Sequence, residues 1–375
     1  RYEDAAWQQE ASARVDHAHM IRDRVMPDQI HNFAHNNEWL CRNLVHVGRW
    51  RDAVDLAKNM ISLPRHPEYN TLSKRGSTYY GRLRLFETLT KYELWDEAIA
   101  LCHSAYLEPA DDAKEQVKRL RVLGTAYFRS GDVENGRKII AELEERLQRE
   151  RDDQRLAEQD AEETIVAPLR PPAPPGTHVV FKPDAETAKK VEQARKGATK
   201  PFHAPIRALE RALDELRGRA VAAEADYKTA YDLLKKAGGV EAGDLARVQL
   251  LAGDGDAAEA ALRKECERGE NEVLPRAHLV DLLWQRGDRD EAAKAFEELR
   301  SLSGSIEFGS PVFDRLTPIA LELGLPEDWR MPATRAEDIG DRPDLATLGP
   351  FRWAAYEAPA WTLADADGQT VSLSD

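Results

Sequence analysis

Apolar residues recur along most of this chain at the three- and four-residue spacing of amphipathic helices. The segment 206–216 is one example, and its apolar positions on one helical face are Ile206, Leu209, Leu213 and Leu216. Strict alternation of apolar and polar residues occurs near the C-terminal end, around Trp361 and Val371. The sequence therefore predicts an all-α fold followed by a short β-hairpin.

A short signature recurs within the helical patterns: a turn residue followed, five positions later, by a small residue. The pairs are Gly48 and Ala53, Glu93 and Ala98, Gly131 and Gly136, Ala225 and Ala230, Gly253 and Ala258, and Gly287 and Ala292. Glycine tolerates the left-handed backbone that ends a helix, and an aspartate after it can cap the next helix. A small side chain lets the second helix pack closely on the first. We therefore expect a series of helical hairpins.

The spacing of these turns is similar to that of a known repeat. Gly253 and Gly287 are 34 residues apart, which is the period of the tetratricopeptide repeat (TPR), and these segments resemble that family. The other intervals are 45, 38, 94 and 28 residues, so the expected array is degenerate and interrupted. The resemblance implies an α–α superhelix that binds proteins. An apolar helix over 316–325 is expected to cap the array.

The largest interruption is polar and then rich in proline. Residues 142–163 are almost wholly polar, and 165–183 contain six prolines, which favour a semi-rigid, extended linker. We expect the helices on either side, over 134–163 and 184–220, to form an arm. The predicted organisation is an N-terminal array (1–164), a proline-rich linker or loop (165–183), a second array (184–330), an extended tether (331–357) held by Phe351 and Trp353, and a C-terminal segment (358–375).

The C-terminal segment predicts a strand, a turn at Asp367-Gly368 and a second strand. Its pattern, Ala-Pro-x-Trp-x-Leu-x-Asp-x-x-Gly-x-x-Val-x-Leu-Ser-Asp, resembles the N-terminal edge of the redoxin family of thioredoxin-fold proteins, which includes alkyl hydroperoxide reductases and thiol-specific antioxidants. The resemblance implies an exported or periplasmic thiol–disulfide oxidoreductase or peroxiredoxin-like parent, whose reactive cysteines would follow Asp375. The alternative is a stand-alone TPR adaptor or assembly protein without redox activity.

Composition narrows the classes of function. A net charge of −14 argues against nucleic-acid binding, and the sequence lacks an apolar run long enough to span a membrane. Cys41, Cys102 and Cys266 are far apart and form no Cys-x-x-Cys. We expect them to be small buried hydrophobes, and we predict that this chain alone has no thiol–disulfide or peroxidase activity and no cofactor.

Counting back from the turn residues places mainly basic and aromatic side chains on the first helix of the first three hairpins, where the TPR resemblance implies a concave groove. The predicted groove residues are His35, Arg42, His46, Tyr80, Lys91, Lys118, Arg121 and Arg129, with Glu38 and Glu87 among them. Converging cations bind carboxylates, so an acidic protein or peptide partner is expected. The asparagine that some carboxylate-binding TPR domains use is absent, since the matching positions hold Arg42, Glu87 and Thr125. Ordinary solvated charges are the alternative.

The N-terminal segment is also rich in histidine. His31 and His35 are four residues apart, so that on one helix face both could reach a metal ion. The spacing identifies no third ligand. Surface or capping histidines are the alternative.

Overall fold

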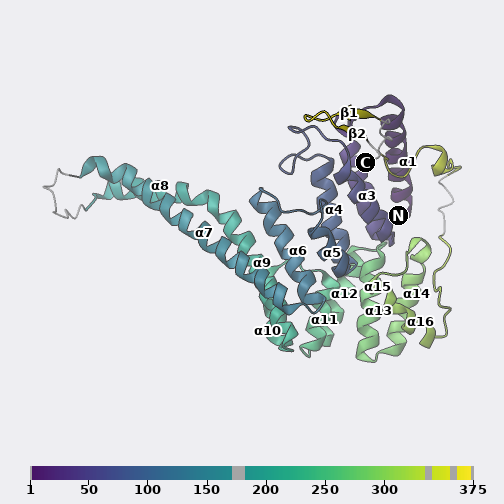
Figure 1. Cartoon of the computed structure of the whole chain (residues 1–375). Coiled ribbons are helices and arrows are strands. Elements are labelled where there is room, and N and C mark those ends of the chain that lie inside the picture. Colours follow the sequence, from purple (N-terminus) through teal and green to yellow (C-terminus); the bar gives the residue numbers. More distant parts are fainter. Residues whose placement is uncertain (1, 171–181, 334–339, 355–360, 373–375) are drawn as a thin grey trace.

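Helices form most of the described chain (Figure 1). The computed structural model describes residues 2–170, 182–333, 340–354 and 361–372. The helices of the first half are α1 (Tyr2–Asp23), α2 (Phe33–Val47), α3 (Trp50–Ser62), α4 (Ser77–Lys91), α5 (Trp95–Cys102), α6 (Ala113–Arg129) and α7 (Val133–Val166). Those of the second half are α8 (Ala185–Thr199), α9 (His203–Ala223), α10 (Tyr227–Ala237), α11 (Ala242–Leu251), α12 (Gly255–Arg268), α13 (Val273–Arg286), α14 (Arg289–Arg300), α15 (Pro311–Asp314) and α16 (Leu316–Glu322). Among the described helices, none has the length and hydrophobicity that crossing a membrane would require.

The predicted turn residues all adopt the left-handed backbone. Their φ angles are 89° at Gly48, 58° at Glu93, 83° at Gly131, 63° at Ala225, 90° at Gly253 and 86° at Gly287. In each case a helix begins two residues later, and the small residue five positions on is buried. The helical hairpins α2–α3, α4–α5, α6–α7, α9–α10, α11–α12 and α13–α14 are therefore confirmed. Two of the turns use a residue other than glycine, which costs about 1–2 kcal/mol of backbone strain at each.

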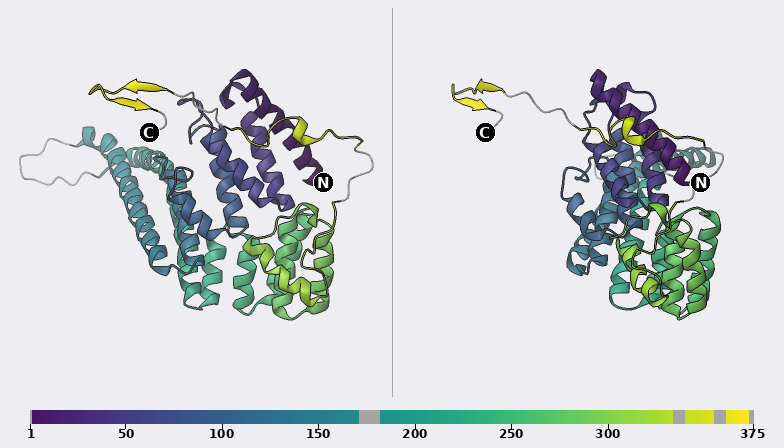
Figure 2. Two further views of the ribbon diagram at one scale, coloured as in Figure 1. Left: turned by 45° about the vertical axis from the view of Figure 1, so that its right-hand side comes forward. Right: turned by 90° about the vertical axis from the view of Figure 1, so that its right-hand side faces the viewer.

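The array curls back so that its last helices contact its first hairpin. The Glu307 amide donates to the Gly48 carbonyl at 3.0 Å, and Trp50 Nε1 donates to the Glu307 carbonyl at 2.9 Å. The rings of Tyr92 and Phe313 lie 5.8 Å apart in an apolar core to which both halves contribute. The predicted apolar helix at 316–325 corresponds to α16, which packs on α13. The hairpins thus surround a common centre (Figures 1 and 2).

Helices α7, α8 and α9 form the expected arm, which projects from the body (Figure 1). Near its base, Leu143 and Leu147 of α7 share a core with Leu213 of α9. Farther along, charged pairs join α7 to α8 and α9, at 2.5 Å for Arg195–Glu162 and 2.8 Å for Arg151–Glu210. The polar stretch 142–163 lies within α7. Most of the proline-rich linker, 171–181, lies outside the described residues.

Residues 340–354 cross α1 and α3 as a largely extended segment, here called the strap. Arg14 Nη1 donates to the Gly349 carbonyl at 2.8 Å. Asn59 holds Trp353 twice: its Nδ2 donates to the Trp353 carbonyl at 2.7 Å, and its Oδ1 accepts from the Trp353 amide at 3.1 Å. The ring of Trp353 packs on the cluster that contains Met20, Phe33 and Leu63. The expected packing of the tether through Phe351 and Trp353 is confirmed.

The C-terminal residues form the predicted hairpin. Strands β1 (Thr362–Ala364) and β2 (Thr370–Ser372) pair antiparallel, with Leu363 opposite Val371. Gly368 has a φ of 76°, as the Asp-Gly turn requires. Positions 358–360 and 373–375 of the predicted segment lie outside the described residues. Leu363 is 63% exposed, and Figure 2 shows the hairpin standing away from the helices. It buries little of its own apolar surface.

Candidate ligand-binding cavity

A cavity of about 300 Å³ lies where the two halves of the array face each other. Helices α4, α6, α9, α11 and α13 line it, together with the turn before α5 and the loop before α11. The charged or titratable lining residues are Glu87, Lys91, Glu93, Lys118, Arg121, Glu215, Arg219, Glu241, Asp244 and His278. The volume is at the lower end of the range of small-ligand sites.

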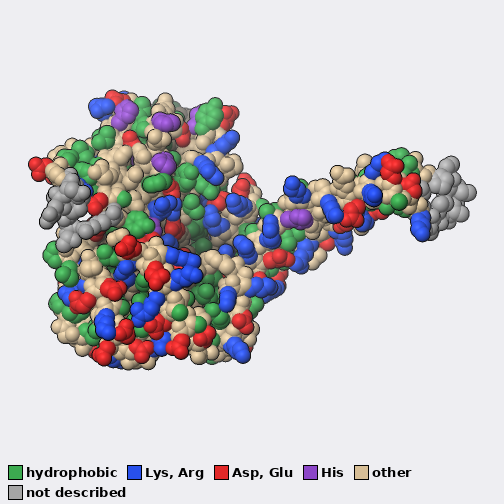
Figure 3. Space-filling model, turned by 180° about the vertical axis from the view of Figure 1, so that it is seen from behind, with side chains coloured by type: hydrophobic (Ala, Val, Ile, Leu, Met, Phe, Trp, Pro, Cys, Tyr) green, Lys and Arg blue, Asp and Glu red, His purple; other side chains and the backbone are tan. Residues whose placement is uncertain are grey.

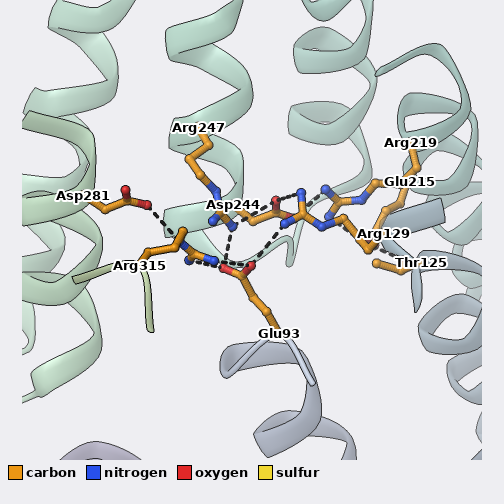
Figure 4. A network of polar contacts seen from close by, with 9 residues as sticks. All are labelled: Glu93, Thr125, Arg129, Glu215, Arg219, Asp244, Arg247, Asp281 and Arg315. Carbon is orange, nitrogen blue, oxygen red and sulfur yellow. Dashed lines mark hydrogen bonds and ion pairs between the residues drawn. The ribbon is translucent and has the colours of Figure 1, made fainter. Parts of the chain in front are cut away.

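A network of buried arginines and carboxylates adjoins the cavity (Figure 4). This arginine network consists of Glu93, Thr125, Arg129, Glu215, Arg219, Asp244, Arg247, Asp281 and Arg315. At its centre, Glu93 accepts from Arg247 at 2.5 Å, from Arg315 at 2.8 Å and from Arg129 at 3.1 Å. Asp244 pairs with Arg219 at 2.5 Å and with Arg129 at 3.1 Å. Six separate parts of the chain therefore meet through charge-assisted hydrogen bonds and ion pairs.

The network is ionic at neutral pH. Burial raises the pKa of Glu93, but Arg247 and Arg315 together lower it by more and bring it to about 2. Burial likewise raises the pKa of Asp244, and Arg219, Arg129 and Arg247 bring it well below its usual range. Buried charges are tolerated only when they are paired and hydrogen-bonded. These residues therefore hold α4–α5, α6, α9 and α11 in one arrangement.

Two titratable groups on the cavity wall differ from the rest. Within the described residues, the side chains of Glu241 and His278 make no hydrogen bond and no ion pair within 4.0 Å. Burial raises the pKa of Glu241 to about 7, although nearby Lys91 opposes the shift. Burial, with Arg247 adding to it, lowers the pKa of His278 to about 4, so that its imidazole is neutral. Titratable groups whose pKa values are shifted by burial, on the wall of one cavity, make it a candidate functional site.

The local sequence explains how His278 reaches this place. Gly243 stands at the beginning of α11, facing the His278 ring of α13. A Cβ atom at residue 243 would lie 2.2 Å from that ring. A glycine is therefore required for the two helices to approach with the imidazole between them.

The structure gathers half of the predicted groove residues at this cavity. Lys91, Lys118 and Arg121 line it, and Arg129 belongs to the arginine network. Each is paired: Lys91 with Glu87 at 3.0 Å, Lys118 with Glu115 at 2.9 Å, and Arg121 with Glu215 at 2.5 Å. The sequence predicted that these cations are open to a partner, whereas carboxylates of their own helices, Glu87 and Glu115, and Glu215 of the second half pair with them.

The other predicted groove residues lie elsewhere. His46 Nδ1 is 3.0 Å from Glu272 Oε2, and its ring stacks on Tyr2 at 4.3 Å. Arg42 lies over the Trp39 ring, which also contacts His35. Tyr80 packs edge-on against Tyr79. These four do not face the central cavity, and their binding of a partner stays a prediction.

The metal hypothesis for His31 and His35 rested on one shared helix face, and that premise is wrong. His31 lies in a turn, Asn32 has a φ of 67°, and α2 begins only at Phe33. His35 alone is helical. Within the described residues, no cluster of three or more His, Cys, Asp or Glu side chains is placed to hold a metal ion.

The cysteines match the sequence interpretation in two cases and partly in the third. Cys41 and Cys102 are buried, and Cys266 is partly buried. Burial raises the pKa of Cys102 and of Cys266 to about 11, and that of Cys41 further. The reactive thiolate is therefore scarce at neutral pH.

No family model, no curated protein and no solved structure matches this chain.

Proposed function

We propose that this chain is the protein-interaction scaffold of a redoxin-like thiol–disulfide oxidoreductase or peroxiredoxin, and that its helical hairpins form a TPR-like array. The turn and small-residue signature, which recurs with left-handed turns in all of the predicted hairpins, supports the TPR-like part. The arm carries the scaffold part of the proposal. The bases of α7 and α9 belong to the array, and α9 also lines the cavity, whereas the outer part of the arm projects beyond the body, so its exposed length serves contacts beyond this chain (Figure 3).

The composition of the arm surface is consistent with a docking element. The face of the arm seen in Figure 3 carries many Lys, Arg, Asp and Glu side chains. Leu156 of α7 is 53% exposed, and Leu169 just beyond this helix is 48% exposed. Apolar side chains surrounded by charges are a common composition of transient protein interfaces.

The C-terminal hairpin supports the redoxin part. A two-stranded ribbon is marginally stable in water unless a further strand or a helix covers it. The exposed apolar side chains of Leu363 and Val371 would be buried in a larger sheet. The strap fixes the segment that leads to this hairpin on α1 and α3. The scaffold would then present a redoxin domain at a defined side of the array.

The scaffold is tested by site-specific photo-crosslinking in the cells that produce the protein. A photoreactive residue at Leu156 is expected to give one discrete adduct with another protein. The matched control is Leu321, which is similarly exposed at 55% but lies on α16, far from the arm in sequence. The absence of an adduct from Leu156, or the same adducts from both positions, would contradict docking on the arm.

The redoxin part is tested separately on the gene. We expect a hydrophobic strand followed by a cysteine or a Cys-x-x-Cys within a few tens of residues after Asp375. Its absence would leave the other function considered, a TPR adaptor without redox activity. The two experiments test the scaffold role and the redoxin role separately. A TPR adaptor without redox activity would still give the crosslinked adduct at Leu156, although its gene would lack the cysteine.

A further inference from the structure

Among the described residues, Glu241 has no ion-pair partner of its own on the cavity wall. Glu38, Glu87 and Glu241 share two cations, Arg84 and Lys91. Arg84 contacts both Glu38 and Glu87, and Lys91 Nζ lies 3.0 Å from Glu87 Oε1. Of these three carboxyls, Glu241 is the one for which the described residues supply no ion pair within 4.0 Å.

The other charges that face the cavity do not supply the missing cation. They are Glu93 from the turn before α5, Lys118 and Arg121 from α6, Glu215 and Arg219 from α9, and Asp244 from α11. The cations among them are paired with the carboxylates Glu115, Glu215 and Asp244. His278 from α13 is neutral and contributes a hydrogen-bond acceptor without adding charge.

Apolar side chains make up much of the remaining wall. They are Leu83, Phe86, Trp95, Val122 and Val240. This lining would contact an alkyl chain well and would fit a hydrated inorganic cation poorly, because such an ion keeps its water shell. The cavity thus combines one unmatched carboxyl with an apolar lining.

We propose that the cavity binds a protonated alkylamine, either a free molecule or a lysine side chain, with Glu241 as the counter-ion of the ammonium group. An ammonium would find an unpaired carboxylate, whereas an anion would have to break the existing ion pairs of Lys91, Lys118 or Arg121. The charge of this ligand is opposite in sign to that of the acidic partner expected from the sequence. The inference is independent of the proposed scaffold role.

The test is calorimetric titration of the full chain with n-butylammonium, with n-butyrate as the anion of similar size. Binding of n-butylammonium is expected to strengthen as pH rises through about 7, because Glu241 is then deprotonated. His278 stays neutral over this range and does not contribute to the change. Butyrate is expected not to bind in the cavity.

Glu241→Gln is expected to weaken n-butylammonium binding roughly tenfold to a hundredfold and to abolish its pH dependence. Glu97→Gln is the matched control, since Glu97 is partly buried, burial raises its pKa, and it does not line the cavity. Far-UV circular dichroism establishes that both variants are folded. Equal affinity of Glu241→Gln and Glu97→Gln would overturn the proposal.

The variant Lys91→Met distinguishes a cationic ligand from an anionic one. It removes the cation that Glu87 and Glu241 share and thereby raises the pKa of Glu241 further, so n-butylammonium should bind more tightly to this variant than to the parent chain at a pH where Glu241 is deprotonated. A groove for acidic ligands predicts the reverse, a loss of butyrate binding. Tighter binding of butyrate than of n-butylammonium to the parent chain, or no n-butylammonium binding at millimolar concentrations, would also overturn the proposal.

The source of the amine is resolved by a second probe, Nα-acetyl-lysine N-methylamide. Binding at least roughly tenfold tighter than that of n-butylammonium would assign the cavity to a lysine side chain of a partner protein. Similar or weaker binding would assign it to a free alkylamine. Both outcomes support the ammonium site.

Discussion

Replacing Glu93 by glutamine removes one negative charge from the centre of the arginine network and keeps the shape of the side chain. Glu93 is 4% exposed and accepts hydrogen bonds from Arg129, Arg247 and Arg315. Its pKa falls from 4.5 to about 2 on folding, because the arginines outweigh the effect of burial. At neutral pH this depression corresponds to about 3 kcal/mol of stability. The loss expected from Glu93→Gln is therefore about 3 kcal/mol, at the lower end of what breaking a buried ion pair costs.

The assay is urea-induced unfolding followed by circular dichroism, and the comparison is with Glu134→Gln. Glu134 pairs with Lys138 at 2.8 Å, but its side chain is 82% exposed, so this change should leave the unfolding midpoint almost unaltered. The contribution of Glu93 is present above the unfolded pKa and is lost as pH falls through the folded pKa of about 2. The difference between the parent chain and Glu93→Gln should thus be constant above about pH 5 and shrink between there and about pH 2. Equal midpoints for the two variants at neutral pH would refute the role of Glu93 as the centre of the network.

The remaining predictions concern thiols, glycines and the strap. The native chain should react slowly with a thiol reagent at neutral pH and should reduce neither insulin nor peroxide, since burial raises the pKa of all of its cysteines; fast labelling of the folded chain would contradict this. Gly243→Ala should lower stability in thermal denaturation by about 1–3 kcal/mol, because a Cβ would meet the His278 ring. Gly197→Ala should raise stability by about 0.4–1 kcal/mol, because its helical site is open, and the opposite order of the two glycine variants would be inconsistent with this packing. Asn59→Ala should raise amide hydrogen exchange in the strap around Trp353, and unchanged exchange there would show that its two hydrogen bonds do not hold the strap.

The hairpins were predictable because the rules that set them are local. A left-handed residue, a helix start two residues later and a small residue five positions on all lie within one short segment. Glu93 and Ala225 follow this rule without glycine, so spacing identified them where residue type would not. The arm was predictable for a similar reason, since its polar helix and its proline-rich boundary are both visible in composition.

The cavity was predictable only in part. Lys91, Lys118 and Arg121 come from the first helices of successive hairpins, so counting from the turns found them. Their surroundings depend on closure of the array, which places Arg121 beside Glu215, 94 positions away, and Glu93 beside Arg315, 222 positions away. Long-range pairs of this kind leave no periodic signal in the sequence. The pairs Glu215–Arg219 and Asp244–Arg247 have helical spacing, but that spacing is also typical of solvated helix surfaces.

The error at His31 has a simple local cause. Asn32 adopts the left-handed conformation and delays the start of α2 to Phe33. Asparagine enters this conformation more readily than most residues, because its short side chain can bond to nearby backbone. The four-residue spacing of His31 and His35 therefore corresponds to one helix face only if the helix begins before His31, and α2 does not.

Contact between the first and last hairpins constrains how this chain can vary and unfold. In an open row of repeats, each repeat touches only its neighbours, so an end can fray or a repeat can be gained with little effect on the middle. Here the amide of Glu307 bonds to Gly48, and Trp50 bonds back to Glu307. Fraying at either end breaks contacts at the other, so both ends should exchange their amide protons only on global unfolding. Adding or removing one hairpin would separate Glu307 from Gly48 and Trp50, so a change in the number of hairpins would cost the chain this contact.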